Sequence, residues 1–253
     1  MGAARRHRRP QPDLQARVRA GLITTSPVSK LEADERPRVT RREQRILSAQ
    51  EIAALLAAAD GDAFDLIAIH LYTGMRQGEI LGLTWKQVDF DAGVIHVREQ
   101  LQRPRDGQPA RLAPLKTSES RRDVTMLPQL SSLLAKRKLA SVFSGDDDFI
   151  FAAGPSEAIH YSRANRLLHS AAEAAGIDRF KSHDFRHTYA SHLIVSLGED
   201  IKTVQKELGH AKASITSDVY AHLFDQARHR DELRDRLAVS EYASLLGPKP
   251  LST

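Results

Sequence analysis

The stretch HDFRHTYASHL, residues 183–193, does most to decide the fold of this chain. It predicts the opening of a long helix over His183–Leu197. His183 and Arg186 stand three residues apart, so they share one face of that helix near its start. A titratable imidazole beside a fixed cation suits phosphate chemistry. The plain structural alternative is a polar helix start in which Asp184 acts near the cap.

The same stretch carries the spacing of a zinc site as a competing interpretation. His183-Asp-Phe-Arg-His187 differs from the zinc-protease pattern H-E-x-x-H only by Asp in place of Glu. Arg186 lies beside both imidazoles and would repel a divalent cation, and the sequence marks no third ligand. We therefore expect no metal at this position.

Outward from this stretch, helical patterns surround one short region of strands. A capping box at Ser48-Ala-Gln-Glu51 starts the first helix of the folded domain. Further helices are predicted over 62–72, 77–83, 128–141, 162–175, 201–208, 215–222 and 225–239. Short strands are predicted over 94–97, 112–115 and 123–127, with residues 116–122 as the turn of a hairpin. The fold class is therefore mainly α with a small antiparallel β-sheet.

The composition is that of an ordinary globular protein. The 253 residues, 41% hydrophobic and 27% charged, suffice for one large domain with a short appendage. No apolar run approaches the ~18 residues that a membrane span requires, so we expect no membrane partner. Because the chain has no cysteine, a thiolate metal site and a cysteine nucleophile are both excluded.

The net charge of +5 is unevenly distributed. Residues 1–45 carry 12 Lys and Arg against 5 Asp and Glu, whereas the rest of the chain carries 25 against 27. Inside the main domain, the segment from Arg103 to Lys138 holds nine basic and three acidic residues. Such a local patch can bind phosphates even where the whole domain is nearly neutral.

A second stretch with residues suited to binding an anion is TGMRQGEILGL, residues 73–83. Arg76 stands at the predicted start of a helix, and Glu79 follows on the same face, where it can orient the guanidinium. A helix N-terminus together with an arginine makes a good anion site. The structural alternative is an exposed Arg–Glu pair on a helix.

Two further stretches are LKTSESRRDV, residues 115–124, and LGHAKASITSDVYAH, residues 208–222. The first places Lys116 at the tip of the predicted hairpin, where a lysine is often simply solvated. The second contains His210 and Tyr220, and a tyrosine late in a helical domain is often a packing residue. A tyrosine with a reference pKa of ~10 acts as a nucleophile near neutral pH only with help from cations.

In this order, the four stretches resemble the motifs of the tyrosine recombinase (phage integrase) family. The resemblance covers roughly residues 44–222 and implies the catalytic-domain fold of that family. It also implies a site-specific recombinase that cleaves and rejoins DNA strands through a covalent 3′-phosphotyrosyl intermediate. That chemistry uses no metal, no ATP and no other cofactor.

The resemblance assigns the nucleophile and the cations residue by residue. Tyr220 matches the nucleophile of the family. Arg76 and Arg186 match the two arginines that clamp the non-bridging oxygens of the scissile phosphate. Lys116 matches the hairpin lysine that protonates the 5′-oxygen leaving group.

The remaining assignments concern acid–base and supporting groups. His183 matches the general acid/base near the tyrosine, and His210 matches a histidine that hydrogen-bonds the phosphate. Glu79 matches the acidic residue that supports the first arginine. His187 and His192 match no catalytic position, and we assign them to helix packing or to contacts with the DNA backbone.

The partners implied are double-stranded DNA, a homo-tetramer on paired recombination sites, and a directionality or DNA-bending factor. The resemblance implies a DNA-associated protein of the cytoplasm. A helix over 225–239 resembles the C-terminal helix that docks on a neighbouring subunit in this family. Packing of this helix on its own domain is the alternative.

Three parts of the chain are predicted: a basic lead-in over 1–45, a catalytic domain over 46–224, and a C-terminal helix and tail over 225–253. Family members carry an N-terminal core-binding domain of about 80–100 residues, and the lead-in resembles only its last helix and linker. Two alternatives to recombination therefore stay open. One is a truncated, non-recombining DNA-binding or decoy fragment, and the other is a nicking-closing activity like that of a type IB topoisomerase.

Overall fold

A computed structural model describes residues 14–25, 44–104, 108–115, 117, 120–178, 180–210 and 213–238. The chain divides into two compact units, Met1–Glu43 and Gln44–Thr253. The described part of the first unit contains helix α1 (Leu14–Arg19). The division of the chain into lead-in, catalytic domain and tail stays a prediction. All that follows concerns the second unit.

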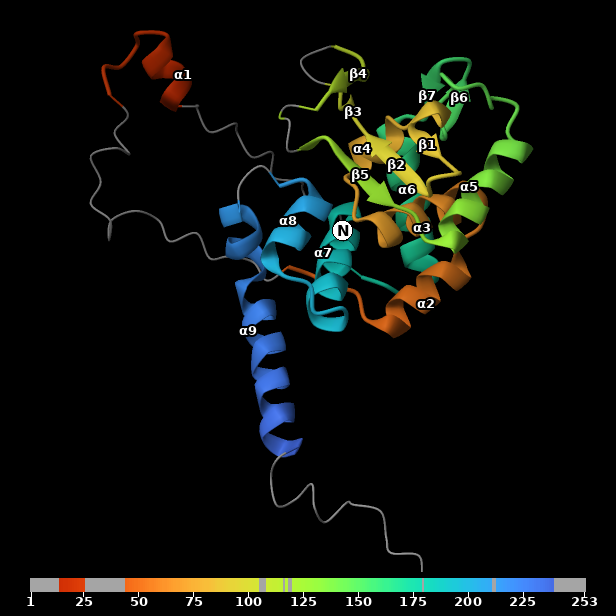
Figure 1. The fold of residues 1–253 in the computed structure, drawn as a ribbon. Coiled ribbons are helices and arrows are strands. Elements are labelled where there is room, and N and C mark those ends of the chain that lie inside the picture. The colour runs from red at the N-terminus through yellow and green to blue at the C-terminus, as the bar shows by residue number, and fades with distance from the viewer. Residues whose placement is uncertain are drawn as a thin grey trace, which may run out of the picture. The chain divides into compact units, whose positions relative to one another are not determined.

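Helices dominate the second unit, as predicted (Figure 1). They are α2 (Ala49–Ala58), α3 (Gly61–Thr73), α4 (Gln77–Leu81), α5 (Pro128–Ala140), α6 (Tyr161–Ala174), α7 (Ser182–Ser191), α8 (Ile201–Leu208) and α9 (Ala213–Ala238). The capping box at the start of α2 is confirmed, because Ser48 Oγ accepts the Glu51 amide and the Glu51 carboxylate accepts the Ser48 amide. None of the described helices is long and apolar enough to cross a membrane.

Three small antiparallel sheets lie beside the helices. The largest has the order β1 (Val88–Asp89), β2 (Val94–Val97), β5 (Arg122–Thr125). The two-stranded sheets pair β3 (Glu99–Gln102) with β4 (Arg111–Pro114), and β6 (Ala152–Gly154) with β7 (Glu157–Ala158).

The predicted hairpin between residues 112–115 and 123–127 is wrong in its pairing. Strand β4 pairs with β3, in the register Leu101↔Leu112, and β5 pairs with β2, in the register Ile95↔Val124. The physical reason is the burial pattern: the β2–β5 pair places Ile95 and Val124 in the core, with no exposed area on either. Strands β4 and β5 therefore pair with the consecutive strands β3 and β2 and not with each other.

The buried side chains form two separate hydrophobic clusters. The larger cluster contains residues from the five helices α2, α3, α4, α5 and α6, from the start of α7 and from the sheet of β1, β2 and β5. Trp85 and Phe185 belong to it. The smaller cluster joins the end of α7 to α8 and α9, and its buried members are Ala190, Leu193, Ile194, Val204, Leu208, Tyr220 and Leu223. The predicted nucleophile therefore belongs to the smaller cluster.

Two predicted helices differ from the observed ones at their ends. The helix predicted over 183–197 changes to a π-helical turn at His192–Ser196, where it meets α8 and α9. The two helices predicted over 215–222 and 225–239 form one continuous helix, α9, because nothing at residues 223 and 224 breaks the helical pattern. The first half of α9 packs on its own domain through Leu223, whereas Leu233 farther along is 44% exposed.

Candidate active site

Arg76 and Glu79 form the pair that the sequence predicts. Arg76 is the residue that caps α4, and its Nη1 donates to Glu79 Oε1 at 2.7 Å. Glu79 Oε2 accepts the backbone N–H of Arg76 at 2.9 Å. Glu79 is fully buried, whereas the Arg76 side chain keeps 36% of its surface exposed. The guanidinium is thus fixed from behind and open to a ligand in front.

Three arginines keep the Glu79 carboxyl in its negatively charged form. Burial alone would raise the pKa of this carboxyl, but Arg122, then Arg76 and Arg186, lower it to about 2. Glu79 is therefore ionised at any physiological pH. Three guanidiniums surround one carboxylate, so the group as a whole stays cationic and suits an anion.

Arg186 is held by main-chain carbonyls rather than by a carboxylate. Its Nη1 donates to Gly74 O at 2.8 Å, and its Nη2 donates to Leu208 O. Burial, and then the neighbouring Arg76, lower the pKa of Arg186 to about 9, which still leaves it charged at neutral pH. Gly74 ends α3 with φ +59°, and a Cβ there would lie 2.3 Å from the Tyr189 ring, so glycine is required.

The predicted nucleophile Tyr220 is buried beside a histidine of α7. Its side chain is only 2% exposed, and its hydroxyl lies 2.8 Å from Nδ1 of His187. Burial raises the pKa of Tyr220 to about 12, against a smaller lowering effect of Arg186. The phenol is therefore protonated at neutral pH in this arrangement.

His187 is the functional residue that the sequence analysis missed. It was assigned to packing or DNA-backbone contacts, whereas the structure places it between His183 and the Tyr220 hydroxyl. The rings of His183 and His187 meet edge to face, with centroids 4.7 Å apart. The signal available in the sequence was spacing alone, because His187 follows His183 by one helical turn on the same face.

Both histidines are biased toward the neutral form. Burial, then the charges of Arg186 and Arg76, lower the pKa of His183. Burial and the neighbouring His183 and Arg186 lower the pKa of His187 to about 4. A neutral imidazole can accept a proton, and His187 is the one of the two rings with a hydrogen bond to the Tyr220 hydroxyl among the described residues. Its lowered pKa makes it a weak base in this arrangement.

His210 lies in the turn that ends α8. Gly209 caps the helix with φ +61°, and the chain then folds back so that the His210 amide donates to Gln205 O. His210 Nδ1 lies 2.8 Å from Thr216 Oγ1 at the start of α9. Burial, followed by Arg186 and Arg76, lowers the pKa of His210 to about 3.

The turn at Gly209 also meets the first arginine. Arg76 Nη2 lies 3.5 Å from Gly209 O, and Arg186 reaches the carbonyl of the preceding Leu208. The structure therefore brings together Arg76, Glu79, Arg186 and His210. Lys116 lies outside the described residues, and the neighbouring Leu115 is buried, with its amide donating to Arg98 O.

A basic cleft of about 850 Å³ opens next to His210. It lies between β5 and α8, and its cationic lining comprises Arg98, Arg121, Arg122, Lys202 and Lys206. The two carboxylates in the cleft are Asp123 and Glu207. The excess of cations suits the phosphate backbone of a nucleic acid.

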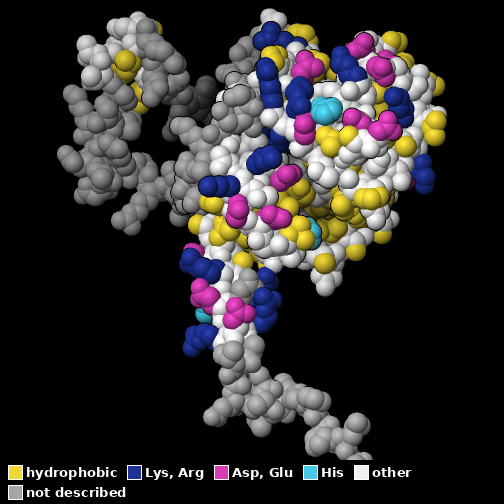
Figure 2. Space-filling view, viewed as in Figure 1, with side chains coloured by type: hydrophobic (Ala, Val, Ile, Leu, Met, Phe, Trp, Pro, Cys, Tyr) yellow, Lys and Arg dark blue, Asp and Glu magenta, His cyan; other side chains and the backbone are white. Residues whose placement is uncertain are grey.

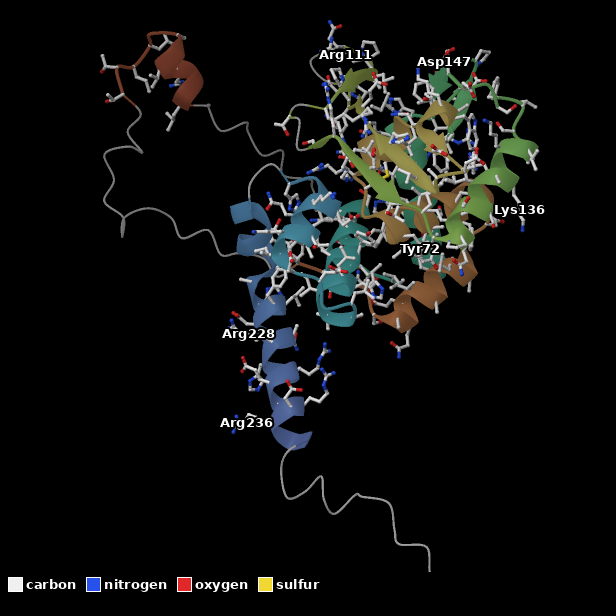
Figure 3. The ribbon with its side chains drawn as sticks, in the orientation of Figure 1. Tyr72, Arg111, Lys136, Asp147, Arg228 and Arg236 are labelled. Atoms are coloured by element: carbon white, nitrogen blue, oxygen red, sulfur yellow. The ribbon has the colours of Figure 1, made fainter. Side chains whose placement is uncertain are left out.

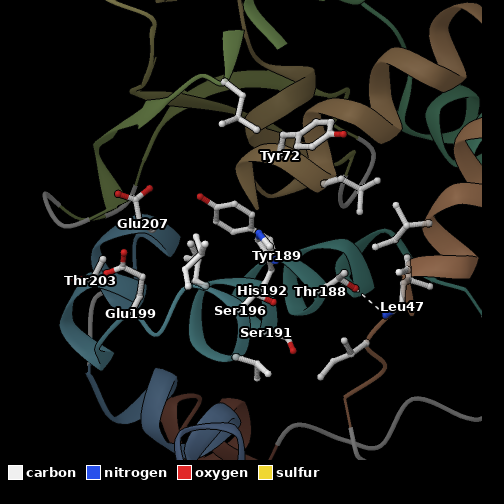
Figure 4. A pocket seen from close by; sticks show the side chains of 18 of the residues that line it. Leu47, Tyr72, Thr188, Tyr189, Ser191, His192, Ser196, Glu199, Thr203 and Glu207 are labelled. Carbon is white, nitrogen blue, oxygen red and sulfur yellow. Dashed lines mark hydrogen bonds between the residues drawn. The ribbon is translucent and has the colours of Figure 1, made fainter. Parts of the chain in front are cut away.

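A second hollow, of about 770 Å³, has a different character (Figures 2 and 4). It runs between α2 and the end of α7, and Leu47, Tyr72 and Tyr189 contribute to its largely apolar lining. The amide of Leu47 donates to Thr188 Oγ1 at 2.9 Å along its floor. The described residues that line this groove include two carboxylates, Glu199 and Glu207, and no lysine or arginine. Glu207 also lines the basic cleft.

The donor set does not fit a metal centre. Within the residues that the structure describes, no group of three His, Cys, Asp or Glu side chains is placed to hold a metal ion. His183 and His187 face each other, but Arg186 and Tyr220 are their nearest polar neighbours.

Comparisons with known proteins identify the family to which this chain belongs. A model of the phage integrase family matches residues 45–227. The chain is 28% identical to tyrosine recombinase XerD of Neisseria meningitidis, over 81% of this chain and 66% of that protein. It is 29% identical to the ICEBs1 integrase of Bacillus subtilis, over 79% of this chain and 56% of that protein.

Solved structures resemble the fold over most of the chain. The Tn1549 transposon integrase in complex with circular intermediate DNA matches with a TM-score of 0.65 and 25% identity, over 87% of this chain and 76% of that one. XerA recombinase matches with a TM-score of 0.59 and 25% identity, over 77% of this chain and 66% of that one. The chain spans about half to two thirds of the length of the curated relatives it matches. With the family model covering most of its length, the chain belongs to the phage integrase family, the tyrosine recombinases.

Proposed function

We propose that this chain cleaves and rejoins strands of double-stranded DNA, with Tyr220 as the nucleophile. The observation that carries the proposal is the convergence of two arginines, three histidines and a tyrosine from separate segments. Arg76 and Arg186 both reach the turn at residues 208–209 that delivers His210. Tyr220 and His183 both contact His187.

The reaction exchanges one phosphodiester bond for another. The Tyr220 oxygen attacks the scissile phosphorus, the bond from phosphorus to the 5′-oxygen breaks, and a 3′-phosphotyrosyl bond forms. The phenol proton passes to an imidazole of α7, either His183 or His187. The departing 5′-oxygen takes a proton from Lys116, a role carried over from the family resemblance. Rejoining runs the same steps in reverse with a 5′-hydroxyl as the attacking group.

Arg76 and Arg186 supply the charge that the transition state requires. Negative charge gathers on the non-bridging oxygens of the phosphorus, and fixed guanidiniums stabilise it without rearranging. His210 adds a hydrogen bond to the same oxygens. Removing one such pre-organised donor typically costs about 10²–10³-fold in rate.

Recombination in full needs more than one site, so we also propose a homo-tetramer on paired DNA sites. The basic cleft beside His210 supports contacts with the DNA backbone. The second half of α9, which carries Arg228 and Arg236 and extends beyond the smaller cluster, is a candidate subunit contact (Figure 3). A directionality or DNA-bending factor completes the proposed set of partners.

A plasmid assay tests the chemistry without knowledge of the target site. The purified chain is incubated with supercoiled plasmid in EDTA, and topoisomers and detergent-stable protein–DNA adducts are measured. We expect relaxation and adduct with the native chain and with the control Tyr72→Phe, whose hydroxyl lies in the apolar groove. We expect neither with Tyr220→Phe. Equal adduct yields from Tyr220→Phe and the native chain would refute the proposed nucleophile.

A further inference from the structure

Arg122, which helps to keep Glu79 ionised, is the most completely buried cation of the site region after Arg186. It is the first residue of β5, and its side chain is only 3% exposed. A buried guanidinium is costly unless its donors are all satisfied. The hydrogen-bond partners of the Arg122 side chain therefore indicate its role in the site.

Its hydrogen bonds reach three different segments. Nη2 donates to Glu79 Oε2 at 2.9 Å on α4. Nε donates to Glu207 O at 2.8 Å, at the end of α8. Nη1 donates to Ser120 O at 3.3 Å, in the connection that follows Lys116. One side chain therefore hydrogen-bonds to the segments next to Arg76 and His210. It also hydrogen-bonds to the connection that follows Lys116, the residue predicted to protonate the leaving group.

The turn at Gly209 is packed directly against this side chain. A Cβ at Gly209 would lie 2.9 Å from Arg122 Nη1 and 3.2 Å from its Cδ. Gly209 also has φ +61°, a conformation that side chains disfavour. The position of His210, the next residue, is therefore set by contact with Arg122.

Arg122 also determines how much charge Arg76 presents. Glu79 gives Oε1 to Arg76 and Oε2 to Arg122, so the carboxylate is shared between the two guanidiniums. If Arg122 were absent, the full negative charge of Glu79 would oppose Arg76 alone. With Arg122 present, more of the positive potential of Arg76 remains for a phosphate.

We propose that Arg122 is a positioning residue for strand cleavage, which orients Glu79 behind Arg76 and fixes the turn that carries His210. This inference rests on the proposed function, since it concerns the same reaction. Arg122 does not touch the scissile phosphate in this scheme. It acts through Arg76 and His210.

Arg137 provides a matched control elsewhere in the fold. Like Arg122 it donates to three partners, but these are two carboxylates and one carbonyl, with Nη1 to Asp65 at 2.6 Å, Nη2 to Asp62 at 2.8 Å and Nε to Ile150 O at 2.8 Å. Arg122 donates to one carboxylate and two carbonyls. These partners lie at the start of α3 and before β6, away from Glu79. Arg137→Gln therefore reproduces the loss of a buried arginine network without changing the site.

The experiment compares Arg122→Gln, Arg122→Lys and Arg137→Gln with the native chain. Adduct formation with Tyr220, the Kd for a DNA duplex and the midpoint of thermal unfolding are measured for each. We expect Arg122→Gln to form adduct about 100-fold more slowly at saturating DNA, the scale of a small misplacement. Arg122→Lys keeps the charge but not the forked geometry, so it recovers only part of the rate. Arg137→Gln loses stability but retains the native rate per folded molecule.

Two readouts separate positioning from a merely structural role. Adding guanidinium ion at low millimolar concentration should partly restore Arg122→Gln and leave Arg137→Gln unchanged. In Arg122→Gln the pKa of Glu79 rises, so activity falls at acidic pH where the native chain is unaffected. Arg76, Arg186, His70 and Tyr161 are the other charged or titratable groups within electrostatic reach of Glu79.

The failures of the two proposals are distinguishable. Native rates per folded molecule in both Arg122 variants, with adduct still dependent on Tyr220, would overturn the positioning role alone. Absence of any adduct from the native chain would overturn the proposed function and this inference with it. If Arg122→Gln does not fold, the Arg122→Lys arm decides, because an unchanged rate there also overturns the role.

Discussion

The two hydrophobic clusters divide the candidate site between them. The larger cluster supports α4, where Ile80 and Leu81 are fully buried beside Arg76 and Glu79. The smaller cluster, with seven buried members, supports Tyr220 on α9. The groups proposed to bind the phosphate and the residue proposed to attack it are therefore supported by hydrophobic clusters of different size.

The difference in anchoring is equally clear. Arg186 binds two main-chain carbonyls, and Glu79 binds two guanidiniums and a backbone amide. Within the described residues, the Tyr220 hydroxyl has one hydrogen-bond partner, Nδ1 of His187. Regions with few buried contacts open at lower free energy than the main core. The comparison teaches that the anion site is pre-organised, whereas the nucleophile can exchange its partner.

The strongest way to break the comparison is to cut the link between the two clusters. Arg186 is that link, because it joins Gly74 at the end of α3 to Leu208 at the end of α8. We expect Arg186→Gln to slow adduct formation about 10²–10³-fold and to lower the free energy of unfolding by about 1–3 kcal/mol, since a carbonyl loses its partner. Single-turnover kinetics and urea denaturation measure the two effects.

The control for this variant is Arg228→Gln, on the exposed part of α9, where the arginine pairs only with surface carboxylates. Surface pairs of this kind contribute about 0–1 kcal/mol. A loss of activity in Arg228→Gln equal to that in Arg186→Gln would contradict the assignment of Arg186.

A second way to break the comparison is to remove the partner of the nucleophile. His187→Phe deletes the acceptor for the Tyr220 hydroxyl while keeping a ring in the same place. We expect adduct formation to slow about tenfold, the effect of losing one hydrogen bond worth about 1.4 kcal/mol. His192→Phe, at an exposed position on the π-helical turn, is the control and should keep the native rate. A native rate in His187→Phe would show that His183 alone serves the tyrosine.

Contacts within this site could be predicted from the sequence only where the partners lie close together in the chain. The i,i+3 spacing of Arg76 and Glu79 and the capping box at Ser48 were readable because both depend on residues close in the chain. Arg122 was not readable, because its partners at residues 79 and 207 come together only in the folded chain. The partnership of His187 and Tyr220 spans 33 residues and was missed for the same reason.

The strands show the same limit. The sequence located β2, β4 and β5 within a few residues, because alternation and β-branching are local signals. It gave β4 the wrong partner, since pairing depends on which register buries Ile95 and Val124. The short strands β1, β6 and β7 have too few residues for any periodic signal and were not predicted.

The difference between the two clusters can be tested by measuring how readily each one unfolds. Leu223→Ala in the smaller cluster and Leu81→Ala in the larger one each remove a buried leucine. Such changes typically cost about 2–5 kcal/mol. We expect Leu223→Ala to speed hydrogen exchange in α9 before the rest of the chain, whereas Leu81→Ala destabilises the whole chain. Uniform exchange in Leu223→Ala would mean that the two clusters unfold as one.

The stability of the folded chain should also depend on pH. Burial lowers the pKa of His70 to about 3, and burial with neighbouring cations lowers that of His187 to about 4. The unfolded chain binds protons below its ordinary histidine pKa of about 6.5, and the folded chain does not. Stability therefore falls as the pH drops from about 6.5 toward 4, by at most about 1.4 kcal/mol per pH unit for each histidine.

Urea denaturation of the native chain and of His187→Phe at several pH values measures this slope. The slope should be shallower in the variant, because one of the shifted histidines is gone. An identical slope in both proteins would show that His187 titrates in the folded chain as it does in the unfolded one.

The most direct test of the central claim is chemical identification of the covalent bond. Adduct formed on plasmid DNA is digested with nuclease and protease, and the modified peptide is identified by mass spectrometry. We expect a nucleotide attached through its 3′-phosphate to Tyr220. Attachment to another residue, or through a 5′-phosphate, would contradict the account of this site.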